Sequence, residues 1–189
     1  MPFYPISTKP GSRTTIALML VLSGALSFQA CLEPTGPADP PLLQTDGAAY
    51  ELTSLELTSI SIGFETVIPY TFTNRTNGSV FIKNCNGGFA LRLDRLVGEV
   101  WETVWSPVIG ACLSLPIVIA ENEVWSDTLR VFGGAPGCHC LPQFDVADPS
   151  GLYRLVWVSA FRSYDFHDAS GHPLELRYRF SNTFTLTVR

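Results

Sequence analysis

Short runs of alternating apolar and polar residues follow one another from about residue 50 to the end of the chain, and turn-forming residues separate them. Such runs predict β-strands, because alternate side chains of a strand point to opposite faces. The runs lie at 50–62, 64–74, 89–96, 100–108, 116–120, 124–132, 152–157 and 175–188. This spacing predicts an all-β protein, an antiparallel sandwich of two sheets with about seven to nine strands over residues 49–189.

Three local signals refine the first strands. A change of phase near Thr58-Ser59 predicts a bulge or a change of sheet. Pro69 predicts a break or a sheet edge, because proline cannot donate to a β-ladder. Thr76 to Ser79 contains Asn-Gly and predicts a type I′ hairpin that pairs Phe72 with Lys83. We expect polar loops at 133–149 and 162–173, and a turn at 121–123 that joins two paired strands.

The stretch from Asn84 to Leu113 predicts a hairpin folded about Gly98-Glu99. In that register the numbers of facing residues sum to 197, so that Cys85 meets Cys112 at the open end. Leu91, Leu93 and Val104 then share a core face. The other face pairs Arg92 with Trp105, Asp94 with Thr103 and Leu96 with Trp101, so Arg92, Trp101 and Trp105 form a candidate binding face.

The first 48 residues have a different character. Lys9 and Arg13 precede the apolar run Ile16 to Leu26, which is typical of a signal peptide over residues 1–30. Cleavage before Cys31 resembles the processing of bacterial lipoproteins and predicts lipidation of that cysteine; the alternative is cleavage near residues 25–27, which releases a soluble secreted protein. The Pro-rich segment 31–48 predicts an extended tether. Localisation is then the bacterial cell envelope, with the lipid in the membrane and the domain facing the periplasm or the exterior.

Charge and cysteine content limit the function classes. Removal of the leader leaves 10 basic and 17 acidic residues, a formal charge of −7, which argues against a nucleic-acid partner. Five cysteines are an odd number for an exported chain, and a lipidated Cys31 leaves four that can pair. The hairpin favours Cys85–Cys112. Cys138 and Cys140 then bond to each other or stay reduced.

Two groups of residues suggest other chemistry. Cys138-His139-Cys140 could act in thiol redox or bind a soft metal, although structural zinc sites use longer spacers. Asp165, His167, Asp168 and His172 crowd one segment, but their residue types are also those of ordinary loops. We expect neither a metal nor a cofactor. Motifs of hydrolases, nucleotide-binding proteins and metalloproteases are missing from the sequence, so we expect no enzyme.

Four stretches together resemble bacterial immunoglobulin-like domains of cell-envelope lipoproteins. They are Tyr70 to Asn74 before a turn, the hairpin ending at Trp101, Ile119 to Glu123, and Gly151 to Leu155. They are also similar to the intracellular proteinase inhibitor family, and the resemblance covers residues 49–189. The last stretch looks like a tyrosine corner, in which Tyr153 would bond back to the turn backbone.

The function that follows is a non-catalytic envelope lipoprotein that acts as a binding or structural module. Its partners would be the membrane, through the lipid, and an envelope protein or a glycan. One alternative is a protease inhibitor or protein-binding domain that uses end loops such as Gly133 to Pro149. The other is a thiol-redox or metal-binding protein centred on Cys138-His139-Cys140.

Overall fold

The computed structural model describes residues 40–189 except 59–60, 86–87, 90, 111–113 and 169. The predicted signal peptide, Cys31 and Cys112 lie outside the described residues. The strands are β1 (Leu43–Thr45), β2 (Ala49–Thr58), β3 (Ser61–Thr73), β4 (Val80–Ile82), β5 (Asn84–Cys85), β6 (Gly88–Phe89), β7 (Leu91–Val97), β8 (Val100–Trp105), β9 (Ile117–Ile119), β10 (Val124–Gly134), β11 (Gly151–Trp157), β12 (Ala160–Asp165), β13 (Ser170–Pro173) and β14 (Phe180–Val188), with one 3₁₀ turn, η1 (Leu176–Tyr178).

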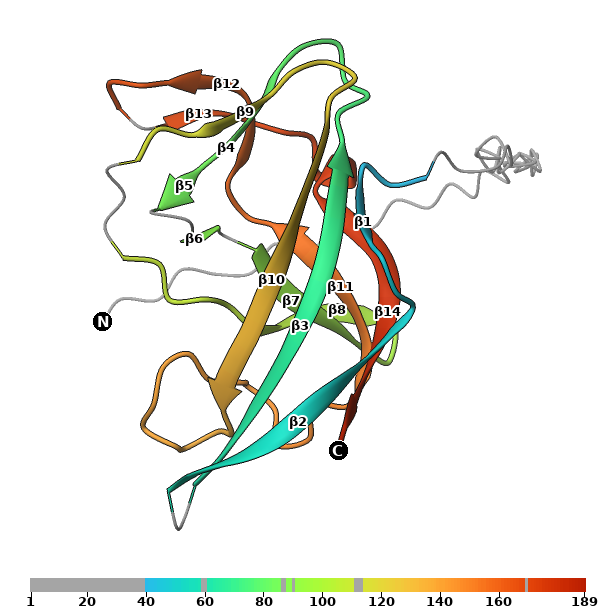
Figure 1. The fold of residues 1–189 in the computed structure, drawn as a ribbon, viewed down its shortest axis with the longest axis vertical. Coiled ribbons are helices and arrows are strands. Elements are labelled where there is room, and N and C mark those ends of the chain that lie inside the picture. The colour runs from blue at the N-terminus through green and yellow to red at the C-terminus, as the bar shows by residue number, and fades with distance from the viewer. Residues whose placement is uncertain (1–39, 59–60, 86–87, 90, 111–113, 169) are drawn as a thin grey trace, which may run out of the picture. The chain divides into compact units, whose positions relative to one another are not determined.

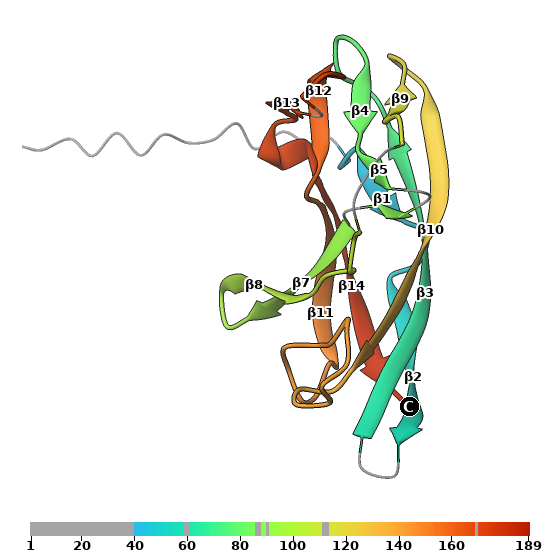
Figure 2. The same ribbon diagram turned by 90° about the vertical axis from the view of Figure 1, so that its left-hand side faces the viewer.

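The long strands form two layers (Figures 1 and 2). One layer contains β10, β3 and most of β2, and the other contains β14, β11, β7 and β8. The buried side chains of both layers meet in a single core, whose largest members are Trp157, Tyr70, Tyr153, Phe72, Phe144 and Phe184. Trp157 packs against Phe72 with ring centroids 4.8 Å apart. The expected all-β class with two main sheets is confirmed.

Strand β2 connects the two layers. Its first half, Ala49 to Leu52, runs parallel to the end of β14, and its second half, from Thr53, pairs antiparallel with β3. The phase change near Thr58-Ser59 predicted a bulge or a change of sheet, and β2 has both: it changes partner after Leu52, and its register against β3 shifts between Glu56 and Thr58. The expected strand does not continue to Ile62, because Thr58 faces Ser61, the first residue of β3.

Pro69 lies inside β3, which has neighbours on both sides. Thr128 of β10 faces Pro69 on one side. On the other side β2 pairs with β3 only up to Glu65 and β1 begins pairing at Tyr70, so Pro69 lies in the gap between these two partners. A residue without an N–H donor fits there, because that side has no strand partner.

The folded domain begins earlier than residue 49. Leu42 and Leu43 are buried, and β1 pairs antiparallel with β3 and touches β14 through Leu43 and Ser181. The last residues of the predicted tether therefore belong to the sandwich. Burial of two adjacent leucine side chains is favourable, because it removes apolar surface that an extended tether would leave in water.

The segment 135–149 closes the open side between the edge strands β10 and β8. Phe144 is fully buried, and its N–H donates to the carbonyl of Gly134 at 2.9 Å. Asp145 N–H donates to Val104 O at 2.9 Å, and Trp105 Nε1 donates to Phe132 O at 3.0 Å. This loop is therefore fixed to both layers.

A smaller sheet of order β13-β12-β4-β9 lies at one end of the sandwich, and the 135–149 loop lies at the opposite end (Figure 1). Three predictions are wrong here. The segment 162–173 contains a hairpin instead of a polar loop, β9 pairs with β4 instead of β10, and Phe72 pairs with Trp125 instead of Lys83. Strands that change sheets at a corner keep their alternation, so the pattern cannot reveal the change.

The central hairpin has the predicted register near its turn. Leu96 faces Trp101, and Asp94 faces Thr103. A register shift between Leu93 and Asp94 then places Leu93 opposite Trp105. The prediction is therefore wrong beyond Asp94: the strand pairing stops at Trp105, and Cys85 lies opposite Gly88 in the short hairpin β5–β6.

Candidate functional site

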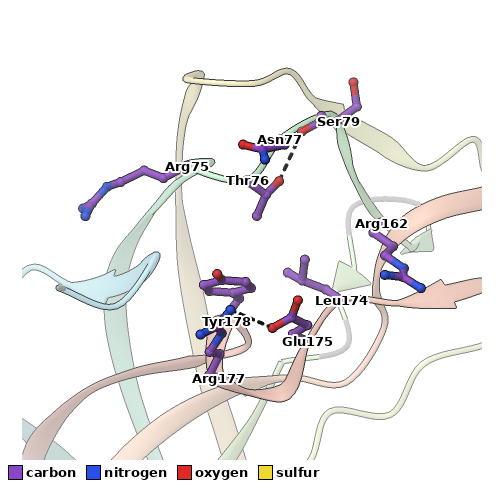
Figure 3. Close-up of a pocket in the computed structure, with 10 residues that line it drawn as sticks. Arg75, Thr76, Asn77, Ser79, Arg162, Leu174, Glu175, Arg177 and Tyr178 are labelled. Atoms are coloured by element: carbon purple, nitrogen blue, oxygen red, sulfur yellow. Dashed lines mark hydrogen bonds and ion pairs between the residues drawn. The ribbon is translucent and has the colours of Figure 1, made fainter. Parts of the chain in front are cut away.

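A cavity of about 390 Å³ opens beside the small sheet, at the end of the sandwich where β3 finishes. Residues 75–79 form one wall, and Arg162 of β12 adds another. The floor consists of residues in and before η1, namely Leu174, Glu175, Arg177 and Tyr178. Figure 3 shows Thr76 and Asn77 on one side and Leu174, Glu175 and Tyr178 on the other. Arg75, Arg162 and Arg177 come from three separate segments, and we name this cavity the arginine pocket.

Asn74 builds the wall of this pocket. Its side chain is fully buried, and its amide nitrogen lies within 3.0 Å of the carbonyl oxygens of Gly78, Ile119 and Ala120. Its Oδ1 accepts from the backbone and the hydroxyl of Thr76, at 3.0 and 2.6 Å. These bonds hold the 74–78 corner and tie it to the segment before β10. Gly78 has a φ of 134° whereas Asn77 has no positive φ, so the predicted type I′ turn is wrong.

The pocket carries positive charge. Arg177 forms an ion pair of 2.9 Å with Glu175, and its guanidinium lies 4.5 Å from the ring centroid of Tyr178. Neither Arg75 nor Arg162 has a hydrogen-bond or ion-pair partner among the described residues. Two unpaired guanidiniums at a cavity can bind carboxylate or phosphate oxygens through paired N–H donors. Figure 3 shows the side chains of Arg75 and Arg162 extending to opposite sides of the cavity and away from its centre, so each offers donors for an anionic group at the rim.

The small sheet presents an aromatic face on the side away from the core. Val80, Ile82, Ile119 and Ala160 point inward and are buried. Phe81, Phe161, Tyr164 and Phe166 contact one another on the outer side, with Phe81 stacked on Tyr164 at 6.3 Å and Tyr164 against Phe166 at 5.4 Å. Phe166 is 57% exposed. This aromatic face adds apolar surface to the end that contains the arginine pocket.

The predicted face of Arg92, Trp101 and Trp105 is only partly formed. Trp105 is buried, because the register shift turns it toward the core, and its inclusion is wrong. The guanidinium of Arg154 lies over two aromatic rings, with its carbon 4.4 Å from the ring centroid of Trp101 and 3.7 Å from that of Phe180. The sequence did not predict a role for Arg154. Arg92 lies beside this stack without joining it.

A buried carboxylate organises the same surface. Asp94 is 3% exposed at its side chain and pairs with Arg92 at 2.9 Å and with Arg154 at 3.3 Å. The hydroxyl of Thr103 donates to Asp94 at 3.0 Å. Two cations and a hydroxyl offset the cost of burying this charge. The cluster therefore has a structural role that accounts for its residues.

The Cys138–Cys140 pair is bonded, and the ring packs against Gly134, where a Cβ atom would overlap both sulfurs. Neither sulfur is then a thiolate that could bind a metal or attack a disulfide. Cys85 also carries a disulfide. Its predicted partner Cys112 lies outside the described residues, so that pairing stays a prediction.

Tyr153 makes the bond that a tyrosine corner requires. Its hydroxyl donates to the carbonyl of Pro149 at 2.7 Å, and burial raises its pKa to about 12. The aromatic ring is fully buried and stacks on Phe184 at 6.3 Å. This bond fixes the loop where it enters β11.

The histidines lie at opposite ends of the domain. His139 is in the disulfide loop, whereas His167 and His172 belong to the hairpin of β12 and β13. Within residues 40–189 and outside the gaps, no three His, Cys, Asp or Glu side chains converge as a metal site would require. In the same part of the chain, no helix has the length and apolar character to span a membrane.

No protein-family model, curated protein sequence or solved structure matches this chain. The structure itself defines, within the described residues, an all-β protein whose eight-stranded sheet forms the two layers, with a four-stranded sheet at one end and the short hairpin β5–β6. The residues of the arginine pocket were missed by sequence reasoning, because the three arginines are far apart in the chain. The signal that pointed nearest to them was the Thr76 to Ser79 turn, which we expected to be a simple hairpin.

Proposed function

We propose that this chain is a non-catalytic binding module of the bacterial cell envelope, anchored by a lipid on Cys31, and that it binds its partner at the arginine pocket. The pocket carries the proposal: unpaired Arg75 and Arg162 flank a cavity of about 390 Å³ in a chain whose mature charge is −7. Such a cavity has the volume of a small-ligand site. The net negative charge of the protein repels anions in general, so an anionic group would be attracted only where positive charge is concentrated, as it is at this pocket.

The immunoglobulin-like arrangement is part of the same proposal. Support comes from the Tyr153 corner and from β2, which changes from one sheet to the other as edge strands do in many sandwiches. The anchor rests on the sequence of residues 1–48, where an apolar leader is followed by Cys31 and the Pro-rich segment.

Mass spectrometry of the mature protein tests the anchor. We expect a diacylglyceryl-modified Cys31 at the N-terminus, and Cys31→Ser should release the protein from the membrane fraction. An unmodified N-terminus near residue 28 would refute anchoring.

Isothermal titration with citrate, a small polycarboxylate, tests the pocket in the secreted Cys31→Ser chain. Unchanged affinity in Arg75→Ala/Arg162→Ala would refute pocket recognition.

A second candidate is protease inhibition by the 135–149 loop. Leu141 is 76% exposed directly after the bonded Cys140, and the loop is fixed at Phe144. A restrained loop loses little conformational entropy on binding, so an exposed apolar side chain on such a loop suits insertion into a protease pocket. A protease panel assayed with micromolar protein decides this candidate: inhibition should disappear in Leu141→Asp, and an uninhibited panel would remove it.

A further inference from the structure

The chain enters the folded domain at the end that contains the arginine pocket. The carbonyl of Leu42 accepts the N–H of Thr73 at 2.8 Å, and Thr73 is the last residue of β3. Asn74 and the pocket wall follow directly. The segment that joins Cys31 to Leu42 therefore attaches beside the pocket, and the disulfide loop lies at the far end.

That segment is short. Pro41 lies ten positions after Cys31. A flexible chain of that length has a root-mean-square span of about 18 Å, and a Pro-rich extended chain reaches about 31 Å. An anchor in the bilayer would therefore hold the pocket within a few tens of ångströms of the lipid headgroups. Over such distances the tether gives headgroups an effective concentration on the order of millimolar or more.

The surface around the pocket suits the water–lipid interface. Leu176, which lies in η1 between the pocket residues Glu175 and Arg177, is 56% exposed, and Val124, which faces Thr73, is 58% exposed. With Tyr178 and the arginines, they place apolar and cationic groups side by side, as interfacial proteins do. The acidic side chains nearby are partly engaged: Glu175 pairs with Arg177, and Glu123 accepts the N–H of Ala120 at 2.7 Å.

We propose that the arginine pocket binds the phosphate headgroup of an anionic phospholipid in the membrane that carries the anchor. Arg75 and Arg162, on opposite sides of the cavity rim, each supply free N–H donors to headgroup phosphates there, and Leu176 enters the interface. The domain is then held with its pocket end against the bilayer and its disulfide loop directed away from it. This inference rests on the proposed anchor only for its biological setting, because the pocket itself is present without the lipid.

Vesicle binding by the isolated domain tests the proposal. Residues 39–189 form a compact unit with its own core, so this segment can be prepared without leader or lipid. We expect co-sedimentation with phosphatidylglycerol vesicles, little with phosphatidylcholine vesicles, and a loss of binding as salt screens the charges. Each arginine near a lipid surface is worth about a fivefold change in affinity, so Arg75→Ala/Arg162→Ala should weaken binding about 25-fold.

Two matched variants sharpen the result. Arg130→Ala removes an exposed arginine of β10 outside the pocket and should leave binding unchanged. Glu175→Gln frees Arg177 and should strengthen binding severalfold, a direction that general damage to the fold would not produce. Circular dichroism and urea unfolding confirm that each variant is folded.

Glycerol 1-phosphate separates the two sources of phosphate. The free compound should compete with vesicles only at millimolar concentration, because it lacks the interface that Leu176 enters. The proposal is overturned if the domain ignores phosphatidylglycerol vesicles, if the double variant binds them equally well, or if glycerol phosphate binds tightly while vesicles do not. Failure of Cys31 lipidation in the mass spectrum would refute the anchor and leave this vesicle result standing.

Discussion

Asn74→Ala should be the most damaging single polar substitution at the pocket end of the domain. The side chain is fully buried and links Thr76 and Gly78 to Ile119 and Ala120. Its two amide hydrogens serve three carbonyl oxygens, so the removal ends about four useful hydrogen bonds, each worth about 1 kcal/mol net. Carbonyl groups left buried without a donor raise the cost, and we expect a loss of about 3–5 kcal/mol.

Urea unfolding followed by tryptophan fluorescence measures this loss. The midpoint should fall while the denaturant slope stays constant, since the folded and unfolded states keep their compactness. The control is Asn77→Ala in the same corner, whose exposed side chain has no partner among the described residues and should change stability by less than about 0.5 kcal/mol. A loss below about 1 kcal/mol for Asn74→Ala would show that Asn74 does not organise the corner.

Three further substitutions test the core and its charges. Tyr70→Phe should leave stability unchanged or raise it by about 1 kcal/mol, because the buried Tyr70 hydroxyl has no hydrogen-bond partner within the described residues; a clear loss in thermal unfolding would contradict this. Tyr153→Phe should cost about 1–2 kcal/mol at pH 7 through the lost bond to Pro149. Burial raises the Tyr153 pKa to about 12. The contribution of this residue to wild-type stability is therefore complete below pH 10 and falls by about 1.4 kcal/mol per pH unit between pH 10 and 12. In pH-dependent urea unfolding, Tyr153→Phe should lack this fall. Asp94→Ala should cost about 3 kcal/mol because Arg154, whose side chain is only 17% exposed, then lacks its counter-charge. Arg92→Ala, at a more exposed position, should cost less than half as much, and equal losses in chemical unfolding would refute this assignment.

The class of fold could be predicted because alternation reports directly on strands. Ile68, Tyr70 and Phe72 alternate and are all buried, and the register of the hairpin near Gly98 follows from the turn alone. The partners of strands could not be predicted. β4 and β9 alternate in the same way whether they extend the main sheets or form a separate one, so local sequence carries no information on that choice.

The candidate site was harder to predict for a physical reason. Trp105 was placed on the candidate binding face because one register was extended past Asp94, where the strand pairing shifts by one residue without any signal in the sequence. Arg75, Arg162 and Arg177 meet through tertiary structure, and each alone resembles an ordinary surface arginine. Tyr153 was found in advance, because a tyrosine corner lies within five residues of chain and its geometry is local.

The pairing of the first strand with the last has a consequence for how the protein is made. Thr45 N–H donates to Asn182 Oδ1 at 2.8 Å across a separation of 137 residues, and Leu43 faces Ser181 beside it. Contacts of such high order form late and slowly. A chain that emerges from the ribosome in N-to-C order cannot bury Leu43 beside β14 until Ser181 is available. The domain is therefore expected to stay open while residues 43–181 are synthesised and to become protease-resistant only in one late step.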